Sequence, residues 1–169
     1  MAPLKMPNLP YSYDVLARDS NSNPLLYQTN NSEVMAILLD LPAFPNQNHA
    51  KNPDHTVLLE ATMSGNNTSP GVGTDGVYRD PWGNPYFITI DANNNGKARD
   101  SFYGTAAVSR LSGQTGINGL YDSIDGSAGG DNFELNGTVM VWSAGSDGMV
   151  ESTNNANAGA NRDNVVSWH

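Results

Sequence analysis

The sequence predicts an α+β fold, in which one short helix precedes a small antiparallel sheet with long decorated loops. Apolar residues recur at helical spacing in one segment of the N-terminal half, NSEVMAILLDL. In the C-terminal half, β-branched and aromatic runs alternate with turn-forming stretches rich in Gly, Asn and Asp. The chain of 169 residues has the length of one domain, so we expect a single folded unit over 1–169.

The predicted helix lies in the N-terminal half. Residues 1–31 place Pro, Asn and Ser around a few apolar anchors, which is typical of an irregular segment. Ser32 is the predicted N-cap of a helix over 32–41, and Pro42 stops that helix. The following stretch, 42–76, is expected to be mostly loop. The helix is short for covering a sheet, and this hints that a longer helix precedes it in the natural protein.

The predicted antiparallel sheet lies within 85–145. The runs PYFITID (85–91) and DSFYGTAAVS (100–109) are separated by a polar turn, and we interpret them as a hairpin. Residues 110–134 are rich in glycine and lack periodicity, which favours a long excursion from the sheet. NGTVMVWSAG (136–145) is the predicted third strand. We expect the apolar residues of the terminal VVSWH to pack back onto the sheet.

The stretch RDPWGNPY predicts a rigid corner directly ahead of the strand at 85–91. Asp80 can accept hydrogen bonds from backbone amides of the turn, while Pro81 and Pro85 restrict φ. Gly83 permits a backbone conformation that other residues resist. Trp82 is predicted to cap the edge of the core. The corner therefore sets the register and direction of the strand that follows.

Charge and composition exclude several classes of function. Acidic residues outnumber basic ones 17 to 8, giving a formal net charge of -9. Such a surface repels phosphate backbones and anionic lipid, so we expect no nucleic-acid partner. The chain has no Cys, which excludes disulfides, thiolate catalysis and Cys-based metal sites. No apolar run has the roughly 20 residues that a membrane-spanning helix needs, so the chain as written is expected to be soluble.

Two polar stretches offer oxygen ligands for a hard cation. The closing loop and tail, 146–169, places Asp147 after a glycine turn and Asp163 before the final apolar run. Calcium prefers six to eight oxygen ligands from carboxylates and carbonyls. The residues alone leave a calcium loop and a solvated loop both open. DANNNG begins at Asp91 like an EF-hand loop, but Phe102 stands where that loop needs an acid, which favours a turn.

Signals for catalysis are weak. His49, His55 and His169 have no recognisable zinc or triad spacing, and we interpret them as surface residues. No GxSxG elbow occurs, and the glycine turns lack the strand and helix context of a phosphate-binding loop. A carboxylate pair for glycoside cleavage would meet in space rather than in sequence, and nothing in the sequence points to one. The chain is therefore not expected to be an enzyme.

Three motifs in order, DPWGNPY, VWSAGSDG and DNVVSW, resemble the C-terminal half of the major pseudopilins of the bacterial type II secretion system, the G-type subunit. The resemblance covers roughly 75–169, with gaps. It implies a pilin-like fold, with a long N-terminal helix packed on a small antiparallel sheet. It also implies a calcium site with the side chains of Asp147 and Asp163. Backbone carbonyls of Ala144, Met149 and Val165 are the further ligands that it suggests.

The resemblance implies a structural rather than an enzymatic role. Such subunits form a homopolymeric pseudopilus with other pseudopilins, on an assembly platform at the bacterial inner membrane, with the head in the periplasm. The prepilin-peptidase site and the apolar helix of the family do not occur in this sequence, so we expect a chain cut after that helix. The loop between Asp147 and Asp163 is longer than is typical of the family. The alternatives are a pilin-like adhesin or binding head and, third, a secreted hydrolase.

Overall fold

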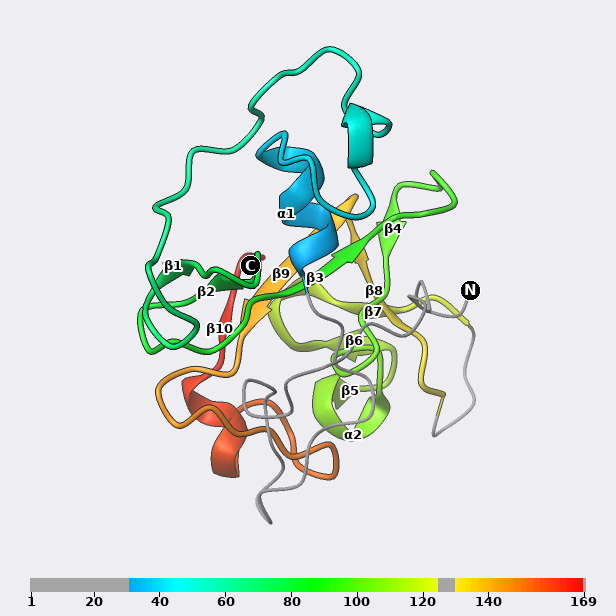
Figure 1. Ribbon diagram of the computed structural model, residues 1–169. Helices are drawn as coiled ribbons and strands as arrows, with labels where there is room; N and C mark the ends of the chain where they lie inside the picture. The colour runs from blue at the N-terminus through cyan, green and yellow to red at the C-terminus, as the bar shows by residue number, and fades with distance from the viewer. Residues whose placement is uncertain (1–30, 125–129, 169) are drawn as a thin grey trace.

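The computed structural model describes residues 31–124 and 130–168, so the predicted irregular segment lies almost entirely outside the described residues. The described residues form a mixed fold with few, short helices and several antiparallel sheets (Figure 1). The helical elements are α1 (Ser32–Leu38), η2 (Gln47–His49), α2 (Ala106–Ser109), η3 (Ile117–Gly119) and η4 (Gly159–Asp163). The strands are β1 (Gly71–Val72), β2 (Tyr78–Arg79), β3 (Phe87–Ile90), β4 (Lys97–Ala98), β5 (Arg110–Ser112), β6 (Thr115–Gly116), β7 (Tyr121–Asp122), β8 (Phe133–Asn136), β9 (Val139–Ser143) and β10 (Val165–Val166).

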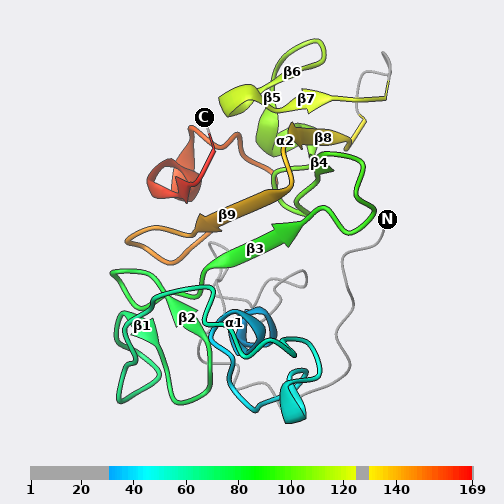
Figure 2. The same ribbon diagram turned by 90° about the horizontal axis from the view of Figure 1, so that it is seen from above.

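The strands pair in three groups within the described ranges. A three-stranded sheet has the order β10-β9-β3, a five-stranded sheet has the order β4-β8-β7-β6-β5, and β1 pairs with β2. All of these pairings are antiparallel. Figure 2 shows β3 and β9 lying between α1 on one side and the five-stranded sheet on the other. The predicted antiparallel α+β class is confirmed at this level.

The predicted hairpin of 85–91 with 100–109 is wrong. Strand β3 pairs with β9, with Phe87 opposite Trp142 and Ile90 opposite Val139. The run 100–109 instead begins with a turn and continues into α2. The physical reason is Asp100, whose carboxylate accepts the backbone N–H groups of Phe102 and Tyr103, both at 2.9 Å. An aspartate that binds the amides of the following residues favours a turn over an extended strand.

The predicted excursion at 110–134 is also wrong, because this segment supplies most of the five-stranded sheet. Its strands are very short, which is why no alternating pattern reveals them. Glycine turns allow the chain to reverse between them, and Ile117, Leu120 and Phe133 are buried. A Cβ at Gly116 would lie 2.6 Å from the Phe133 ring, so this position requires glycine for close packing.

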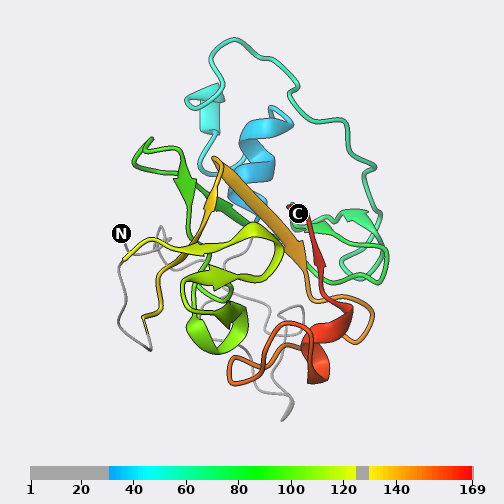
Figure 3. The same ribbon diagram turned by 180° about the vertical axis from the view of Figure 1, so that it is seen from behind.

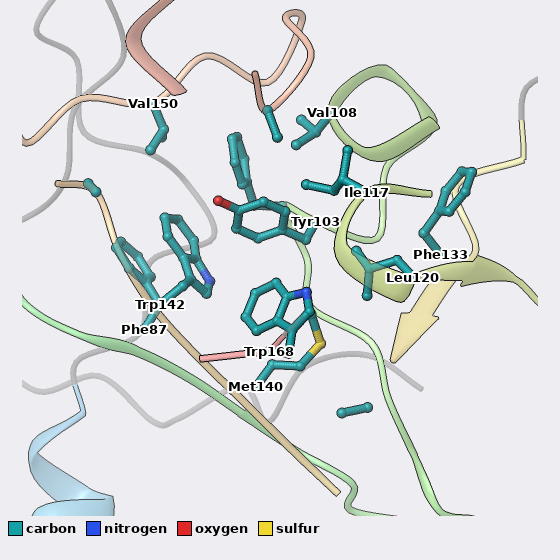
Figure 4. Packing of buried hydrophobic residues seen from close by; sticks show 14 residues of the cluster. Phe87, Tyr103, Val108, Ile117, Leu120, Phe133, Met140, Trp142, Val150 and Trp168 are labelled. Atoms are coloured by element: carbon teal, nitrogen blue, oxygen red, sulfur yellow. The ribbon is translucent and has the colours of Figure 1, made fainter. Parts of the chain in front are cut away.

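The main core is aromatic and centres on Trp142 of β9 (Figure 4). Its ring stacks on Phe87 with centroids 4.0 Å apart, and meets Tyr103 edge to face at 5.2 Å. Tyr103 also meets Trp168 edge to face at 5.1 Å. The predicted return of the C-terminus onto the sheet is therefore confirmed, since β10 pairs with β9 and Trp168 is buried. Figure 3 shows β10 running beside β9.

Helix α1 is held against the β2–β3 region by the residue before it. Asn31 is 3% exposed, and its side chain donates to the carbonyls of Tyr78 and Tyr86 and accepts the N–H of Tyr78. The N-cap residue is Asn31 rather than Ser32, and the Asn31 side chain makes no capping hydrogen bond to the helix. The helix ends at Leu38, earlier than predicted. Among the described residues, no helix is long and apolar enough to cross a bilayer.

Candidate functional site at the closing segment

The predicted corner forms a tight turn between β2 and β3. Asp80 is buried, and one carboxylate oxygen accepts the N–H groups of Trp82 at 2.9 Å and Asn84 at 2.8 Å. Gly83 has a φ of 91°, and a Cβ there would lie 2.2 Å from the Thr68 carbonyl oxygen. The predicted roles of Asp80 and Gly83 are confirmed. Trp82 does not cap the core, because it is 51% exposed and does not belong to the buried aromatic cluster.

The corner is hydrogen-bonded to the end of β9. The Ser143 hydroxyl donates to the second carboxylate oxygen of Asp80 and accepts the N–H of Gly145 at 3.0 Å. The Asn84 side chain donates to the Gly145 carbonyl at 2.7 Å. Asp80 and Ser143 are both about 1% exposed, so these bonds lie in a medium where unpaired polar groups are costly. Two motifs that lie far apart in the sequence therefore form one hydrogen-bonded unit.

The closing segment, residues 146–168, is tied to the same unit through Asp163. One carboxylate oxygen of Asp163 accepts the Ser146 hydroxyl at 2.7 Å and the Asp147 N–H at 3.0 Å. Gly145 has a φ of 68°, and a Cβ there would lie 2.1 Å from the Asp163 carbonyl oxygen. Only glycine allows both this backbone conformation and this approach. The third motif thus meets the second at the end of the sheet.

The structure brings the two predicted metal-binding carboxylates near each other. Burial raises the pKa of Asp147, and the negative charge of Asp163 raises it further against the opposing Met149 N–H. Burial acts in the same direction on Asp163, but the Ser146 hydroxyl and backbone N–H groups outweigh it and lower the pKa. The Asp147 N–H bond to the Asp163 carboxylate places the two residues side by side.

The predicted carbonyl ligands flank these carboxylates in the chain. Ala144 directly follows β9 and is fully buried, and Met149 lies just beyond the Asp147 turn. The Asp147 carboxylate accepts the Met149 N–H at 2.8 Å. Val165 begins β10 and pairs with Ser143 in the sheet. Hard cations prefer oxygen ligands such as carboxylates, but these two carboxylates accept the Ser146 hydroxyl and the N–H groups of Asp147 and Met149, which satisfy them without a metal.

A buried asparagine that sequence reasoning missed organises the rest of the closing segment. Asn161 is 1% exposed, and its side-chain oxygen accepts the Glu151 N–H at 2.8 Å. Its amide nitrogen donates to the carbonyls of Glu151 and Asn154, both at 2.9 Å. The hydrogen bonds of this one side chain thus take the place of the backbone hydrogen bonds that a longer strand pair would make. No local pattern distinguishes Asn161 from the other asparagines of this stretch.

The closing segment also contacts α2 and the turn before it. The Ala156 N–H donates to the Val108 carbonyl at 2.9 Å, and the Asn164 side chain donates to the Tyr103 hydroxyl at 3.2 Å. Val150 and Ala156 are buried in the main core. The closing segment therefore has contacts to the rest of the fold along its length, while many of its residues are exposed.

The DANNNG stretch is a turn, as predicted. The carboxylate of Asp91 accepts the N–H groups of Asn95 at 3.2 Å and Gly96 at 2.7 Å. These amide donors fill the positions that a cation would need, and they explain why the pKa of Asp91 is lowered although burial opposes the shift. The turn connects β3 and β4, which belong to different sheets.

The interpretation of the histidines as surface loop residues agrees with an exposed His55 and a partly exposed His49, but these two residues are not isolated. His49 and His55 converge on Asp40 at the end of α1. His169 lies outside the described residues. Asp40, His49 and His55 are nine and six positions apart in the sequence, and this spacing alone does not identify a metal site.

No protein-family model matches the chain, and no curated protein or solved structure shows significant similarity to it.

Proposed function

We propose that this chain is the globular head of a structural fibre subunit of the kind that builds a type II secretion pseudopilus, and that it is not an enzyme. One observation carries the proposal. The three motifs behind the resemblance are separated in the sequence, yet their residues Asp80, Ser143, Gly145 and Asp163 meet in one network of hydrogen bonds and close contacts. Motifs that are joined in this way have a common structural task.

In this proposal the closing segment supplies a rigid lateral surface. A fibre subunit must keep its shape while neighbouring heads press against it, so its surface segments need fixed conformations. Side chains fix this segment at both ends, through Ser143 and Asp163, and in the middle through Asn161. Heads of this kind would pack against copies of the same chain and other pseudopilins in the periplasm, above an assembly platform in the inner membrane.

Calcium is part of the proposal. Asp147 and Asp163 would hold the ion with their carboxylates, and the carbonyls of Ala144, Met149 and Val165 are the additional ligands. When bound, the cation supplies the positive charge that offsets the repulsion between the two carboxylates. A ligand that binds only the folded state at a hundred times its dissociation constant adds about 2.7 kcal/mol of stability. The chain's own residues would position the segment, and calcium would tighten it.

Assembly in cells tests the proposed function. The natural gene product is overproduced in its host, and sheared surface fibres are labelled with an antibody against this head. A matched strain without the gene is assayed for release of its secreted enzymes. We expect labelled fibres in the overproducing strain and a loss of secretion in the deletion strain. Normal secretion together with unlabelled fibres would refute the proposal. Surface labelling on single molecules with normal secretion would favour the adhesin alternative.

A further inference from the structure

Three potential metal ligands converge at the end of α1, far in the sequence from the closing segment. His49 Nδ1 lies 2.6 Å from Asp40 Oδ1, and His55 Nδ1 lies 3.3 Å from Asp40 Oδ2. The two imidazole rings face each other with centroids 3.9 Å apart and an interplanar angle of 49°. One ligand atom from each residue lies within 4.8 Å of the others. In the three ribbon views, η2 lies beside α1 (Figures 1, 2 and 3).

Two buried asparagines hold the backbone that carries these side chains. Asn46 is 0% exposed, donates to Asp40 Oδ1 at 3.3 Å, and accepts the N–H groups of Lys51 and Asn52 at 3.0 Å. Asn52 is 6% exposed, and its side chain donates to the carbonyls of Ile37 at 3.0 Å and Thr56 at 2.7 Å. The loop is thereby bound to the last turn of α1. The ligands sit on a preorganised frame, which metal sites require.

The backbone at all three positions is unusual. Asp40, His49 and His55 have φ values of 53°, 58° and 51°. Asp40 ends α1 in the left-handed conformation, with Leu41 N–H bonded to the Ala36 carbonyl at 2.9 Å. Glycine is the usual residue at this position after a helix, because a side chain is strained there. Four residues of this region have a positive φ, and three of them, all except Asn48, carry groups that can bind a metal; backbone strain of this kind gathers at functional sites.

We propose that Asp40, His49 and His55 form a binding site for a divalent transition-metal ion of the zinc class. Two imidazoles and one carboxylate are ligands that zinc accepts, whereas calcium prefers oxygen ligands. Bonds of about 2.0–2.1 Å in a tetrahedral site place ligand atoms about 3.3–3.4 Å apart. The His55 contact, made to Asp40 Oδ2, already has this length, whereas the His49 contact, made to Oδ1, is about 0.7 Å shorter. The carboxylate must therefore turn to present one oxygen to the ion.

The site would have three protein ligands and a fourth position on the solvent side. The His55 side chain is 60% exposed, which gives the ion a path of entry. Metal binding replaces the Nδ1···O contacts with Nδ1–metal bonds, and each neutral imidazole then carries its single proton on Nε2. The ion would tie the end of α1 to the loop that leads to Thr56. This site is independent of the proposed secretion role and of the Asp147–Asp163 carboxylates.

Calorimetric titration of tag-free, EDTA-treated protein with zinc chloride tests the proposal. We expect one zinc ion per chain, and at least about tenfold weaker binding in His55→Ala and in Asp40→Asn. The sequence has three histidines, so His169→Ala is the matched control and should bind zinc as the wild type does. A calcium titration should give the same heats with the wild type and with His55→Ala.

Imidazole resonances in the wild-type protein give a second readout that does not depend on the folding of any variant. Zinc should shift the ring signals of His49 and His55 and leave those of His169 unchanged at one equivalent. Three results would each overturn the site. His55→Ala could bind zinc as the wild type does, His169→Ala alone could abolish the zinc heats, or the ring signals of His49 and His55 could stay unchanged.

Discussion

Substitution of Ser143 by Ala removes the hydroxyl that joins the corner to the end of β9. Two consequences follow from its position, which is 1% exposed. The Asp80 carboxylate loses a donor, and hydrogen bonds to charged groups contribute about 1.5–3 kcal/mol. The Gly145 N–H loses its acceptor in a buried place, at a cost of about 1–3 kcal/mol. Because the two effects overlap, we expect a loss of about 2–4 kcal/mol in the free energy of unfolding.

Urea denaturation followed by tryptophan fluorescence measures this loss. The exposed Ser152 lies in the same segment, and Ser152→Ala is the matched control, which should stay within about 0.5 kcal/mol of the wild type. A domain of this size is stabilised by about 5–15 kcal/mol, so the expected loss is a large fraction of the total. If Ser143→Ala is as stable as Ser152→Ala, the corner and the closing segment are not coupled through this hydroxyl.

Three further perturbations test other parts of the structure. Asp147→Asn removes the repulsion from Asp163, so the melting midpoint of this variant in EDTA should equal or exceed that of the wild type. Only the wild type should gain stability from calcium. Equal calcium responses of the two proteins would contradict the carboxylate site. Asp75→Ala leaves the buried Arg79 guanidinium unpaired and should cost about 3 kcal/mol in urea at pH 7. Burial raises the pKa of Asp75, but the bonds and charge of Arg79 outweigh burial and lower it. The pair therefore stabilises the fold fully above the ordinary pKa of 3.8, and this contribution is lost as the pH falls through the lowered folded pKa. An Asp75→Ala variant that loses as much stability in acid as the wild type would contradict this. Trp142→Ala should cost about 3–5 kcal/mol by calorimetry, and a loss below 1 kcal/mol would mean that the aromatic cluster is not the main core.

The parts of the fold that the sequence predicts are those with local causes. Asp80, Pro81 and Gly83 build the corner through contacts within a few residues, so their pattern is sufficient. The strand around Trp142 and the return of Trp168 are marked by β-branched and aromatic residues in short runs. Helix α1 is also local, although its end depends on Asp40 rather than on Pro42.

The pairing of β3 could not be predicted from neighbouring runs. The run 100–109 is the nearest candidate partner of β3 in the sequence, yet β3 pairs with β9. Asp100 turns the chain, and its carboxylate accepts a hydrogen bond from Trp142 Nε1 of β9 at 3.1 Å. Such a choice depends on contacts between distant residues. The two-residue strands between 110 and 134 escape notice for another reason, since an alternation needs several residues to become visible.

The candidate sites differ in how far the sequence could indicate them. Asp147 and Asp163 are suggested by a resemblance, and the structure brings them together. Asn161 carries no signal, because its importance comes from burial alone. The convergence of His49 and His55 on Asp40 depends on a loop that two buried asparagines shape, and residue spacing does not encode that shape.

Hydrogen exchange across the closing segment tests the central claim most directly, since a fibre head with this role needs residues 146–168 to be fixed. Protection of Asp147, Glu151 and Ala156 is expected, because their N–H groups are bound to Asp163, Asn161 and Val108. The exposed residues Glu60 and Thr62 are the internal reference. We expect exchange at these three amides to be at least about tenfold slower than at the reference, and slower still with calcium. Exchange as fast as that of Glu60 and Thr62, in calcium and in EDTA alike, would contradict a fixed closing segment.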